Sequence, residues 1–474
     1  MIRPRTATSL LAPAVLVAAC VTLPPKTPAP TLRPAAPVVA APASTPTGQW
    51  PGARWWLRYQ DDTLTTLIER ALEQAPSMTA AAARFDSAQQ QLRLADAARG
   101  VQIDASATAQ RQRLSDSGLF PPAFLGFNWY HQIDLGMRAR YSFDWWGRQR
   151  AEIAAAVSSA RAAEAESAAV ALALATSVAD TYFGWQADQA RLALARERLD
   201  LAEHQLRIAS ARVGAGLDRD DAAQRATAQQ ADAQEQVALI EGAAELRRVV
   251  LAALIGCAPA DLPPLVAHPL PTTSATLPQD LGIDLIGRRP DITASRWRVE
   301  AAFEGVKAAR AEFLPDISLN ALAALSSIDY GKLFEAGSRA PAVGAAVHLP
   351  LFDSGALRAQ HAARRAALRA AVANYDTTLI TAAREVGQQL VLRQQIEARV
   401  SARTAQAEAV ARVAAAAERR VQQGLSDIRP QLDAARSMLE QRAAELELEA
   451  AAVAADIALI QALGGGYESS RNPS

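Results

Sequence analysis

Cysteine and histidine are scarce in this chain of 474 residues, which contains two Cys and five His. Packing or assembly, rather than a disulfide framework, therefore has to stabilise the fold. The His and Cys residues form no His-x-x-x-His or Cys-x-x-Cys spacing, so a metal site is not supported. A glycine-rich phosphate loop and a nucleophile elbow are also lacking. We expect no catalytic residue, no metal, no cofactor and no enzymatic activity.

An excess of one charge is lacking too, because 49 Lys and Arg are balanced by 49 Asp and Glu. A neutral chain has no bulk attraction for polyanions, so we expect no nucleic-acid partner. The length is sufficient for two or more domains.

The N-terminus has the layout of a secretory signal, with Arg3 and Arg5 before an apolar stretch at residues 10–19. The small residues before Cys20 resemble the bacterial lipobox, which implies cleavage directly before Cys20 and lipidation of its thiol. Val21 in the next position, where Asp would favour the inner membrane, implies the outer membrane. An ordinary signal peptide with an incidental cysteine is the alternative.

No later stretch has the ~20 apolar residues of a transmembrane helix, so the chain is either anchored only or spans as a β-barrel. Residues 20–49 are rich in Pro, Ala and Thr, which predicts an extended tether with nothing to bury. Proline-free runs at residues 148–212, 217–258 and 351–429 predict long helices. The first would extend about 100 Å at ~1.5 Å per residue.

The chain repeats itself, which indicates a duplicated unit. The matching segments are 75–80 with 289–294, 101–105 with 315–319, and 212–217 with 420–425. We divide the chain into a signal peptide (1–19), a lipidated tether (20–49), a first repeat (50–258), a connector (259–278), a second repeat (279–466) and a C-terminal tail (467–474). Each repeat is expected to hold a strand pair followed by a long helical hairpin; the pairs are 101–114 with 131–143, and 315–328 with 342–352.

Strict alternation of apolar and polar side chains over residues 132–143 predicts a strand with one face of each kind. Residues 101–108 alternate in the same way, and the second copy does so less cleanly. A solvated hairpin with one buried face is the simplest interpretation. Four strands alone leave open edges, however, and a sheet in lipid must close. Three copies would supply twelve strands, an even number within the range of outer-membrane barrels.

Several motifs, in their order and duplicated spacing, resemble the TolC-like outer membrane factors, specifically the lipidated NodT-type branch of drug-efflux ducts. They are Trp55-Trp56, Phe143-Asp144-Trp145-Trp146-Gly147-Arg148, Arg288-Arg289-Pro290-Asp291-Ile292, Leu351-Phe352-Asp353-Ser354-Gly355 and Ala462-Leu463-Gly464-Gly465-Gly466-Tyr467. The resemblance implies a mainly α fold with a β-barrel part. In the implied homotrimer, a 12-stranded outer-membrane barrel, four strands per chain, continues into a long periplasmic α-helical barrel. Outer-membrane lipid, a periplasmic adaptor and an inner-membrane pump are the implied partners.

The turns that end the long helices are the candidate docking sites. Gly216 and Gly424 stand where a helix must stop and reverse, and glycine tolerates the left-handed conformation needed there. The resemblance implies that these turns meet the adaptor, since Gly216-Leu217 and Gly424-Leu425 match two positions of the family's Val-Gly-Leu-like triplet. Plain helix termination is the alternative, and both can hold together.

Acidic residues follow both turns, and we interpret Asp220, Asp221 and Asp427 as a candidate gate. Three copies of each would form an acidic ring that favours cations, held shut by pairing with Arg219 and Arg429. Capping of the following helices is the alternative role for such carboxylates.

Asp218 belongs to the same acidic run. The family's gate aspartates usually lie about six residues after the tip glycine, where this chain has Ala222 and Pro430. The resemblance therefore does not assign the gate by position.

Trp145 and Trp146 fall where strand passes into helix, and we expect them at the membrane interface, which Trp favours. Packing at the junction is the alternative. Cys257 is expected to be a small buried residue.

These features predict the outer-membrane exit duct of a tripartite (RND-type) efflux pump, which passively exports drugs or small toxic compounds. The alternatives are the outer-membrane channel of a protein secretion system and a lipid-anchored periplasmic adaptor or coiled-coil scaffold. Two helical hairpins, each preceded by a strand pair, favour the duct, because adaptors usually carry one hairpin.

Overall fold

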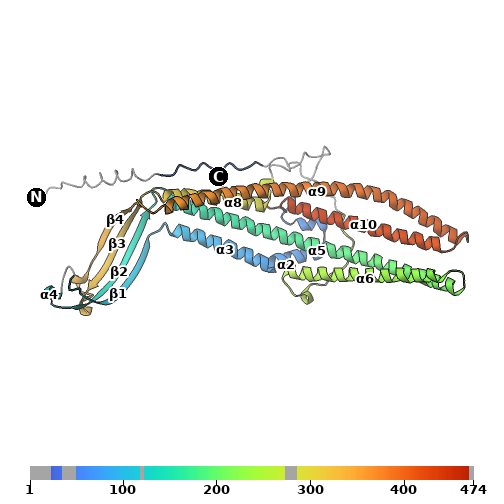
Figure 1. Cartoon of the computed structure of the whole chain (residues 1–474), viewed down its shortest axis with the longest axis horizontal. Helices are drawn as coiled ribbons and strands as arrows, with labels where there is room; N and C mark the ends of the chain where they lie inside the picture. Colours follow the sequence, from blue (N-terminus) through green and yellow to red (C-terminus); the bar gives the residue numbers. More distant parts are fainter. Residues whose placement is uncertain (1–22, 35–49, 118–121, 273–284, 469–474) are drawn as a thin grey trace. The chain divides into compact units, whose positions relative to one another are not determined.

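The structure is a computed structural model, and it describes residues 23–34, 50–117, 122–272 and 285–468 (Figure 1). The chain folds into two compact units. The sheet unit lies within Met1–Leu32, Phe85–Ala163 and Ser295–Tyr375, and the helix unit lies within Arg33–Arg84, Glu164–Ala294 and Asp376–Ser474. Cys20 is outside the described residues, so its lipidation stays a prediction.

Helices make up most of the described chain. The longer ones are α2 (Asp62–Gln74), α3 (Pro76–Ala97), α5 (Arg148–Gly214), α6 (Asp220–Ile255), α8 (Pro290–Ala311), α9 (Ala356–Gln422) and α10 (Arg429–Ala462). The shorter ones are η2 (Trp55–Tyr59), α4 (Pro122–Leu125), η3 (Pro259–Asp261), α7 (Leu285–Arg288), η4 (Tyr330–Lys332) and η5 (Ala336–Ser338). The two longest, α5 and α9, have 67 residues each, so the long helices predicted from the proline-free runs are confirmed.

Local sequence explains where α2 begins and ends. The Asp61 side chain accepts a hydrogen bond from the Leu64 N–H over 2.9 Å and so caps the first turn. Ala75 is extended because the following Pro76 disfavours helical backbone before it. Pro76 then opens α3, a position that needs no N–H donor.

The sheet unit contains one antiparallel sheet in the order β1-β2-β3-β4 (Figure 1). The strands are β1 (Gln102–Arg113), β2 (Trp129–Phe143), β3 (Asp316–Ser327) and β4 (Ala342–His348). All four predicted strands are present, and two of their ends are shifted by more than one residue. The second strand begins two residues earlier than expected, and the fourth ends at His348 because Pro350 cannot donate to a ladder.

The register gathers apolar side chains on one face of this sheet and mostly polar ones on the other. The apolar face carries Ile103, Ala105, Ala107 and Ala109 of β1, Ile133, Leu135, Met137, Ala139, Tyr141 and Phe143 of β2, Ile317, Leu319, Ala321, Ala323 and Leu325 of β3, and Val343, Ala345 and Val347 of β4. Every residue of the edge strands β1 and β4 is exposed. The described residues therefore leave both sheet edges and much of an apolar face uncovered.

The helix unit has a conventional core. Leu64, Leu67 and Ile68 of α2 are fully buried against α5 and α6, together with Leu251 and Ile255 of α6. Trp55 and Trp56 of η2 complete this cluster with 4% and 6% exposure, as expected for apolar anchors. Cys257 is half-buried and packs against the same cluster.

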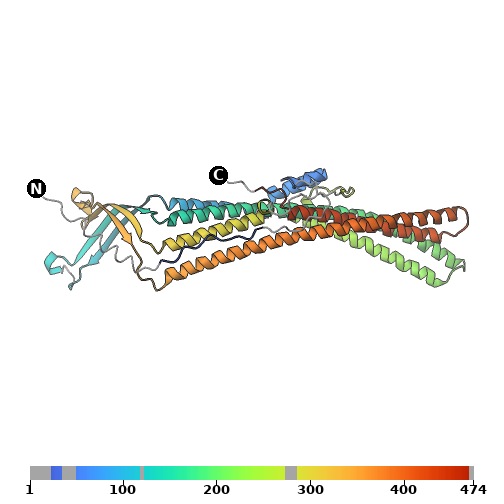
Figure 2. The ribbon, with the colours of Figure 1, turned by 90° about the horizontal axis from the view of Figure 1, so that it is seen from above.

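In the helix unit, α6 runs back along α5 and α10 runs back along α9, as both views show (Figures 1 and 2). The predicted helical hairpins are therefore present. The boundaries of the two repeats as domains stay a prediction.

One helix in the described part of the chain, α5, is long and apolar enough to cross a membrane by composition alone. An 18-residue window of it reaches a mean hydropathy of 1.3, although we expected no such stretch. Val178, Ala179 and Tyr182 of α5 are each 0% exposed within the core of the helix unit. We therefore assign the apolar character of this helix to packing.

Part of the tether also departs from expectation. Pro24, Thr27, Pro30 and Leu32 are half-buried, and the Pro24 carbonyl accepts a hydrogen bond from Arg310 Nε over 2.9 Å. These half-buried residues are about three positions apart, which is the period of a polyproline II helix. Such a helix would turn the same face toward the protein at each of them. The expectation that this tether has nothing to bury is wrong for residues 23–32.

Candidate functional site

The turn after α5 is a Schellman motif centred on glycine. The Leu217 N–H donates to the Arg212 carbonyl over 2.9 Å, and the Gly216 N–H donates to the Val213 carbonyl over 2.9 Å. Gly216 has a φ of 67°, in the left-handed region. These bonds satisfy carbonyls that the end of a helix leaves unpaired.

The turn after α9 has the same construction. The Leu425 N–H donates to Arg420 over 2.8 Å, and the Gly424 N–H donates to Val421 over 3.0 Å. Gly424 has a φ of 68°. The prediction that a helix stops and reverses at each glycine is confirmed.

The leucine that follows each glycine is exposed. In many Schellman motifs this residue packs on the last turn of the helix, but Leu217 is 65% exposed and Leu425 is 73% exposed. The helical residues whose carbonyls accept the two leucine N–H groups are arginines, Arg212 and Arg420. Each turn therefore presents a leucine to the surroundings.

A bidentate ion pair that the sequence pattern did not single out holds the first turn. Arg212 donates to Asp218 from Nε over 2.7 Å and from Nη2 over 3.2 Å. The hydrogen bonds from Arg212 hold the pKa of Asp218 below its ordinary value, and Asp218 raises the pKa of Arg212. Opposite charges six residues apart across a predicted glycine turn were the available signal.

The second turn has a local pair between Asp427 and Arg429, with Oδ2 2.6 Å from Nη2. The N-cap residue of α10, Ile428, makes no side-chain bond, but the Asp427 carboxylate before it accepts the Arg429 N–H, the first of the helix, over 3.2 Å. The side-chain bond from Arg429 lowers the pKa of Asp427, and Arg212 of the first turn lowers it further. The charges of the two turns therefore act on one another.

The other predicted gate residues are arranged differently from expectation. Asp221 lies 2.5 Å from Arg225, one helical turn along, and 3.8 Å from the predicted partner Arg219. Arg219 is the N-cap residue of α6, and its side chain is 93% exposed. Asp220 lies in the first turn of α6 and is exposed. The N-cap residue makes no side-chain hydrogen bond, but Asp220 and Asp221 both lie in the first turn, where a carboxylate suits the helix dipole.

Trp145 and Trp146 lie between β2 and α5 and are 66% and 51% exposed. The Trp146 indole N–H donates to the Pro315 carbonyl over 2.9 Å, while much of the side chain remains exposed. The junction bond supports the packing interpretation, and the exposure is compatible with an interface, so both roles can coexist.

An aspartate starts each of the two long helices, a role that the sequence analysis did not assign. Asp144 accepts the N–H groups of Gln149 and Arg150, each over 3.0 Å. Asp353 accepts those of Gly355 over 3.0 Å and Leu357 over 2.6 Å. Burial opposes the charge of Asp144, but these hydrogen bonds hold its pKa below the ordinary value; backbone bonds, the Leu357 one first, do the same for Asp353.

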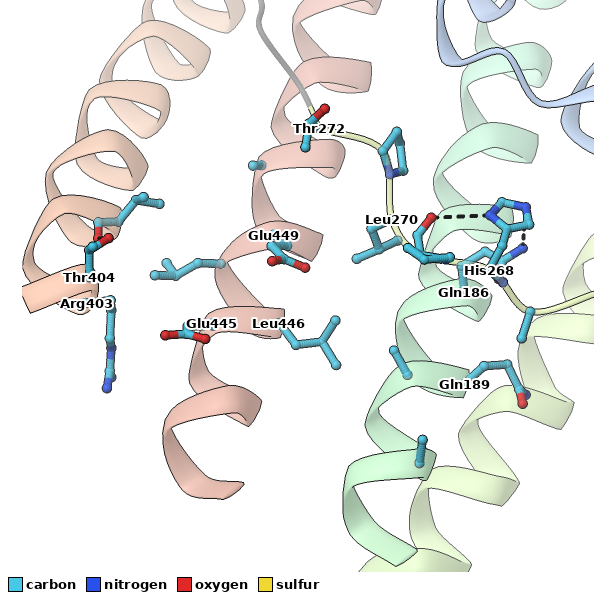
Figure 3. A pocket seen from close by; sticks show the side chains of 18 residues that line it. Gln186, Gln189, His268, Leu270, Thr272, Arg403, Thr404, Glu445, Leu446 and Glu449 are labelled. Carbon is cyan, nitrogen blue, oxygen red and sulfur yellow. Dashed lines mark hydrogen bonds between the residues drawn. The ribbon is translucent and has the colours of Figure 1, made fainter. Parts of the chain in front are cut away.

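Within the helix unit, the first part of the connector lines a cavity of about 890 Å³ with α5, α9 and α10. Figure 3 shows Gln186 and His268 on one wall, and Arg403, Glu445 and Glu449 on the others. Gln186 Oε1 accepts the His268 N–H over 3.0 Å. The cavity has no arrangement of nucleophile and base, and we treat it as structural.

His268 also belongs to a partly buried polar network. Its Nε2 lies 2.9 Å from the Tyr182 hydroxyl and 3.0 Å from Asp61 Oδ2. Tyr182 is 0% exposed, and burial together with its bond to Asp61 raises the pKa of its hydroxyl. The network joins the connector to α5 and to the N-cap of α2.

The Arg-Arg-Pro-Asp motif contributes a buried cation. Arg289 donates to Glu385 over 2.8 Å, to the Ala462 carbonyl over 3.0 Å and to Asp291 over 2.6 Å. Burial opposes its charge, but Asp291 and Glu385 together raise its pKa. Arg289 thus ties the start of α8 to α9 and to the end of α10.

The three glycines after α10 are needed sterically. Gly464, Gly465 and Gly466 all have positive φ, at 91°, 57° and 80°. A Cβ on Gly464 would overlap the Arg288 carbonyl, and one on Gly466 would overlap the backbone of Gly52. The chain can follow this path only without side chains.

Among the described residues, no group of three or more His, Cys, Asp or Glu side chains is placed to hold a metal ion. The described residues show two glycine turns that each have an exposed leucine and an ion pair beside it.

Comparisons with known proteins agree with this arrangement. The sequence profile of the outer membrane efflux protein family matches residues 67–257 and 282–465. The multidrug resistance outer membrane protein MdtP of Escherichia coli K12 is 31% identical over 426 residues, covering 88% of this chain and 87% of that protein. MdtQ of Escherichia coli O157:H7 is 31% identical over 438 residues, covering 88% and 89%.

Solved structures show the same fold. The outer membrane protein VceC from Vibrio cholerae is 34% identical with a TM-score of 0.80, over 88% of this chain and all (100%) of that one. The CmeC outer membrane channel of Campylobacter jejuni has a TM-score of 0.85 over 96% of each chain, and at 22% identity it supports the fold alone. Because the profile and relatives above 30% identity span most of its length, the chain belongs to the outer membrane efflux protein family.

Proposed function

We propose that this protein is the exit duct of a tripartite efflux pump and gives drugs or small toxic compounds a passive path through the outer membrane. The observation that carries the proposal is the four-stranded sheet, whose apolar face and two edges are uncovered, joined to two 67-residue helices. In water such a face and such edges would aggregate. In lipid they are satisfied once the sheet closes on other copies.

Closure requires the two edge strands of different copies to pair. β1 and β4 are exposed along their whole length, and three copies joined β1 to β4 would form a closed ring of twelve strands. The apolar face would point to lipid, and the polar face, with Asp134, Arg138 and Arg140, would line the lumen. A homotrimer is therefore the assembly that we propose.

The height of the apolar face fits a membrane. Ten residue steps separate Ile133 from Phe143 on β2. At ~3.4 Å per residue and a strand tilt of ~40–45°, they span about 25 Å, the height of the apolar band of outer-membrane barrels. Trp145 and Trp146 follow directly, where an interfacial aromatic belt would lie.

The two Schellman turns are the proposed docking sites for the periplasmic adaptor. Gly216 with Leu217 and Gly424 with Leu425 have the same geometry and present an exposed leucine each. A repeated apolar residue on a rigid turn is suited to recognition by a second protein. The inner-membrane pump would supply the energy for transport, and the duct would provide a passive path.

Charged residues at the same turns are the proposed gate. The pairs that hold each turn within one chain are Arg212 with Asp218 and Asp427 with Arg429. Asp220 and Asp221 lie beside them in the first turn of α6 and complete the proposed acidic ring in the trimer, with the N-cap residue Arg219 as a proposed partner. Lipidation of Cys20 would add an anchor, with residues 23–32 already docked on the sheet unit.

The proposed function is tested by exchange of the turn glycines in the native host. A Gly216→Trp, Gly424→Trp double variant should assemble and insert normally but lose drug resistance, because bulky side chains obstruct adaptor docking. A Cβ added at either position would meet no atom within 4 Å, so a side chain can start at either glycine without a clash at its first carbon.

The matched control is Gly216→Ala, Gly424→Ala, which carries the same left-handed strain without the bulk. Resistance should survive largely intact in this control. Full resistance in the Trp variant, with the protein present as a trimer in the membrane, would contradict docking at these turns.

A further inference from the structure

On two adjacent strands, β1 and β2, the apolar face of the sheet gives way to basic and aromatic residues at the same level. On β1 the residues of this face run through Ala107 and Ala109 and then become Arg111 and Arg113. On β2 the change falls on the same level, because Arg111 pairs with His131, while Ala109 still pairs with Ile133. The outer boundary of the apolar band therefore lies between these two pairs.

At this boundary the Arg111 side chain is exposed, and its charge is not paired with a carboxylate of the described residues. Its guanidinium carbon lies 5.1 Å from the centre of the Trp129 ring. A cation–π contact attracts the positive charge to the ring face and does not use up the five N–H donors of the guanidinium. Within the described residues, no hydrogen bond or ion pair engages the Arg111 side chain, which is exposed.

The neighbouring side chains complete a mixed basic and aromatic patch. Arg113 pairs across the strands with Trp129 and contacts the exposed Asp116 over 3.2 Å. The ring of His131 lies 5.2 Å from that of Tyr330, which comes from the loop between β3 and β4. The Arg113 contact is an exposed pair, which contributes little and exchanges readily with water or another anion.

We propose that Arg111, Arg113 and Trp129 form a binding site for the phosphate groups of anionic lipids in the outer leaflet. The proposal rests on the proposed function, since it takes the apolar face to lie in lipid. The patch is at the hairpin-loop end of the sheet, opposite the ends from which α5 and α9 begin. With those helices in the periplasm, this end faces the exterior.

The chemistry favours a lipid over a soluble anion. Arginine binds phosphate through a fork of N–H donors, and tryptophan prefers the membrane interface, where its ring meets the acyl chains. Both groups stand directly above an apolar surface, so a single amphipathic molecule can contact the cations with its headgroup and the exposed Ala107 and Ala109 with its chains. A free phosphate ion would use only the arginines.

The test is native mass spectrometry of the full-length protein in detergent, titrated with a bisphosphorylated lipid A, with phosphatidylcholine and with inorganic phosphate. Lipid A should be retained, up to one molecule per chain. The Arg111→Gln, Arg113→Gln double variant should bind it about thirtyfold more weakly, since each arginine near an anionic headgroup contributes about fivefold.

Two further variants sharpen the test. Arg138→Gln makes the same change on the opposite, polar face of the sheet and should leave lipid A binding unchanged. Asp116→Asn removes the carboxylate beside Arg113 and should strengthen binding, whereas a purely structural role for that ion pair gives no gain.

Each other outcome overturns the inference. If the double variant bound lipid A as tightly as the wild-type protein, the two arginines would not be part of a lipid site. Equal retention of phosphatidylcholine would show an apolar surface only, and displacement by inorganic phosphate at similar concentration would show a plain anion site. Trimer mass and bilayer conductance, measured on the same samples, separate these results from a failure of the proposed duct itself.

Discussion

Gln186 holds His268 from two sides. Its Oε1 accepts the His268 backbone N–H over 3.0 Å, and its Nε2 lies 3.1 Å from the imidazole Nε2. The Gln186 Nε2 also donates to the Val266 carbonyl over 2.9 Å. With 1% exposure, this one side chain of α5 fastens the connector to the helix.

The first prediction is that Gln186→Ala releases the connector locally. Two backbone groups of the connector, the His268 N–H and the Val266 carbonyl, would lose their partner, and each such loss costs about 1 kcal/mol or more. Hydrogen exchange of the His268 amide should therefore accelerate about thirtyfold. Gln189→Ala, which lines the same cavity, is the control and should leave this exchange rate unchanged. Protection that persists in the Gln186 variant would contradict the fastening role.

The second prediction concerns the glycines after α10. Gly464→Ala should lower the free energy of unfolding by about 1–3 kcal/mol, because the new Cβ meets the Arg288 carbonyl and the left-handed φ is strained. Gly305→Ala, in the middle of α8 with nothing within 4 Å, should instead stabilise by about 0.5–1 kcal/mol. Thermal unfolding of both purified variants measures the two shifts, and shifts of the same sign would refute the steric argument.

The third prediction tests the lipid-facing side of the sheet. Leu135→Arg places a charge near the middle of the apolar face and should cost about 2–4 kcal/mol in lipid. Ser106 lies on the polar face, so the arginine of a Ser106→Arg variant would meet water in the lumen. This change should therefore reduce the folding free energy much less than Leu135→Arg does. Folding yields into lipid vesicles compare the two, and equal yields would reject the assignment of faces.

Asp134 and Gly136, the neighbours of Leu135 on the polar face, are less suitable controls for this test than their place in the alternating pattern suggests. Asp134 accepts a hydrogen bond from Ser326 over 2.7 Å and another from Gln132 over 2.9 Å. A Cβ on Gly136 would come within 3.2 Å of Ala324 Cβ. Polar changes at these two lumen-facing positions would therefore disturb packing or bonding as well.

The fourth prediction is the pH dependence of the turns. The pKa values of Asp218 and Asp427 are lowered in the folded protein, chiefly by hydrogen bonds from Arg212 and Arg429. A carboxyl group with a lowered folded-state pKa stabilises the fold above its unfolded pKa of ~3.9. That contribution is lost as the pH falls through the folded value.

Leak conductance of the closed duct in planar bilayers should accordingly stay constant from about pH 7 to about pH 5 and rise only below about pH 4. The Asp218→Asn, Asp427→Asn variant should leak already near neutral pH and show no further acid step. A rise of the wild-type leak between about pH 7 and pH 5 would assign the gate to other groups, such as histidines.

Local sequence patterns were sufficient for the elements of this protein. Proline-free runs predict α5 and α9, and period-2 alternation predicts β2, because both signals depend only on neighbours along the chain. The glycine turns at 216 and 424 followed from the same kind of rule. The family, too, was recognisable from short motifs in their order.

The partners of charged and polar side chains were decided by the tertiary structure. Asp221 with Arg225 has the i, i+4 spacing that a helix favours by itself, but nothing local indicates that Arg289 reaches Glu385 and the end of α10. Such pairs depend on side-chain reach and on which helices pack together, and these are set only when the chain folds.

The change from apolar to basic residues on one face of the sheet depends on both local sequence and tertiary structure. The sequence alone determined that Arg111 follows Ala109 at a spacing of two, on one face of β1. Only the register between strands decided that Trp129 and His131 stand beside it at the same level. Register is a relation between distant segments, so hydrogen bonding across strands, and not composition, created this patch.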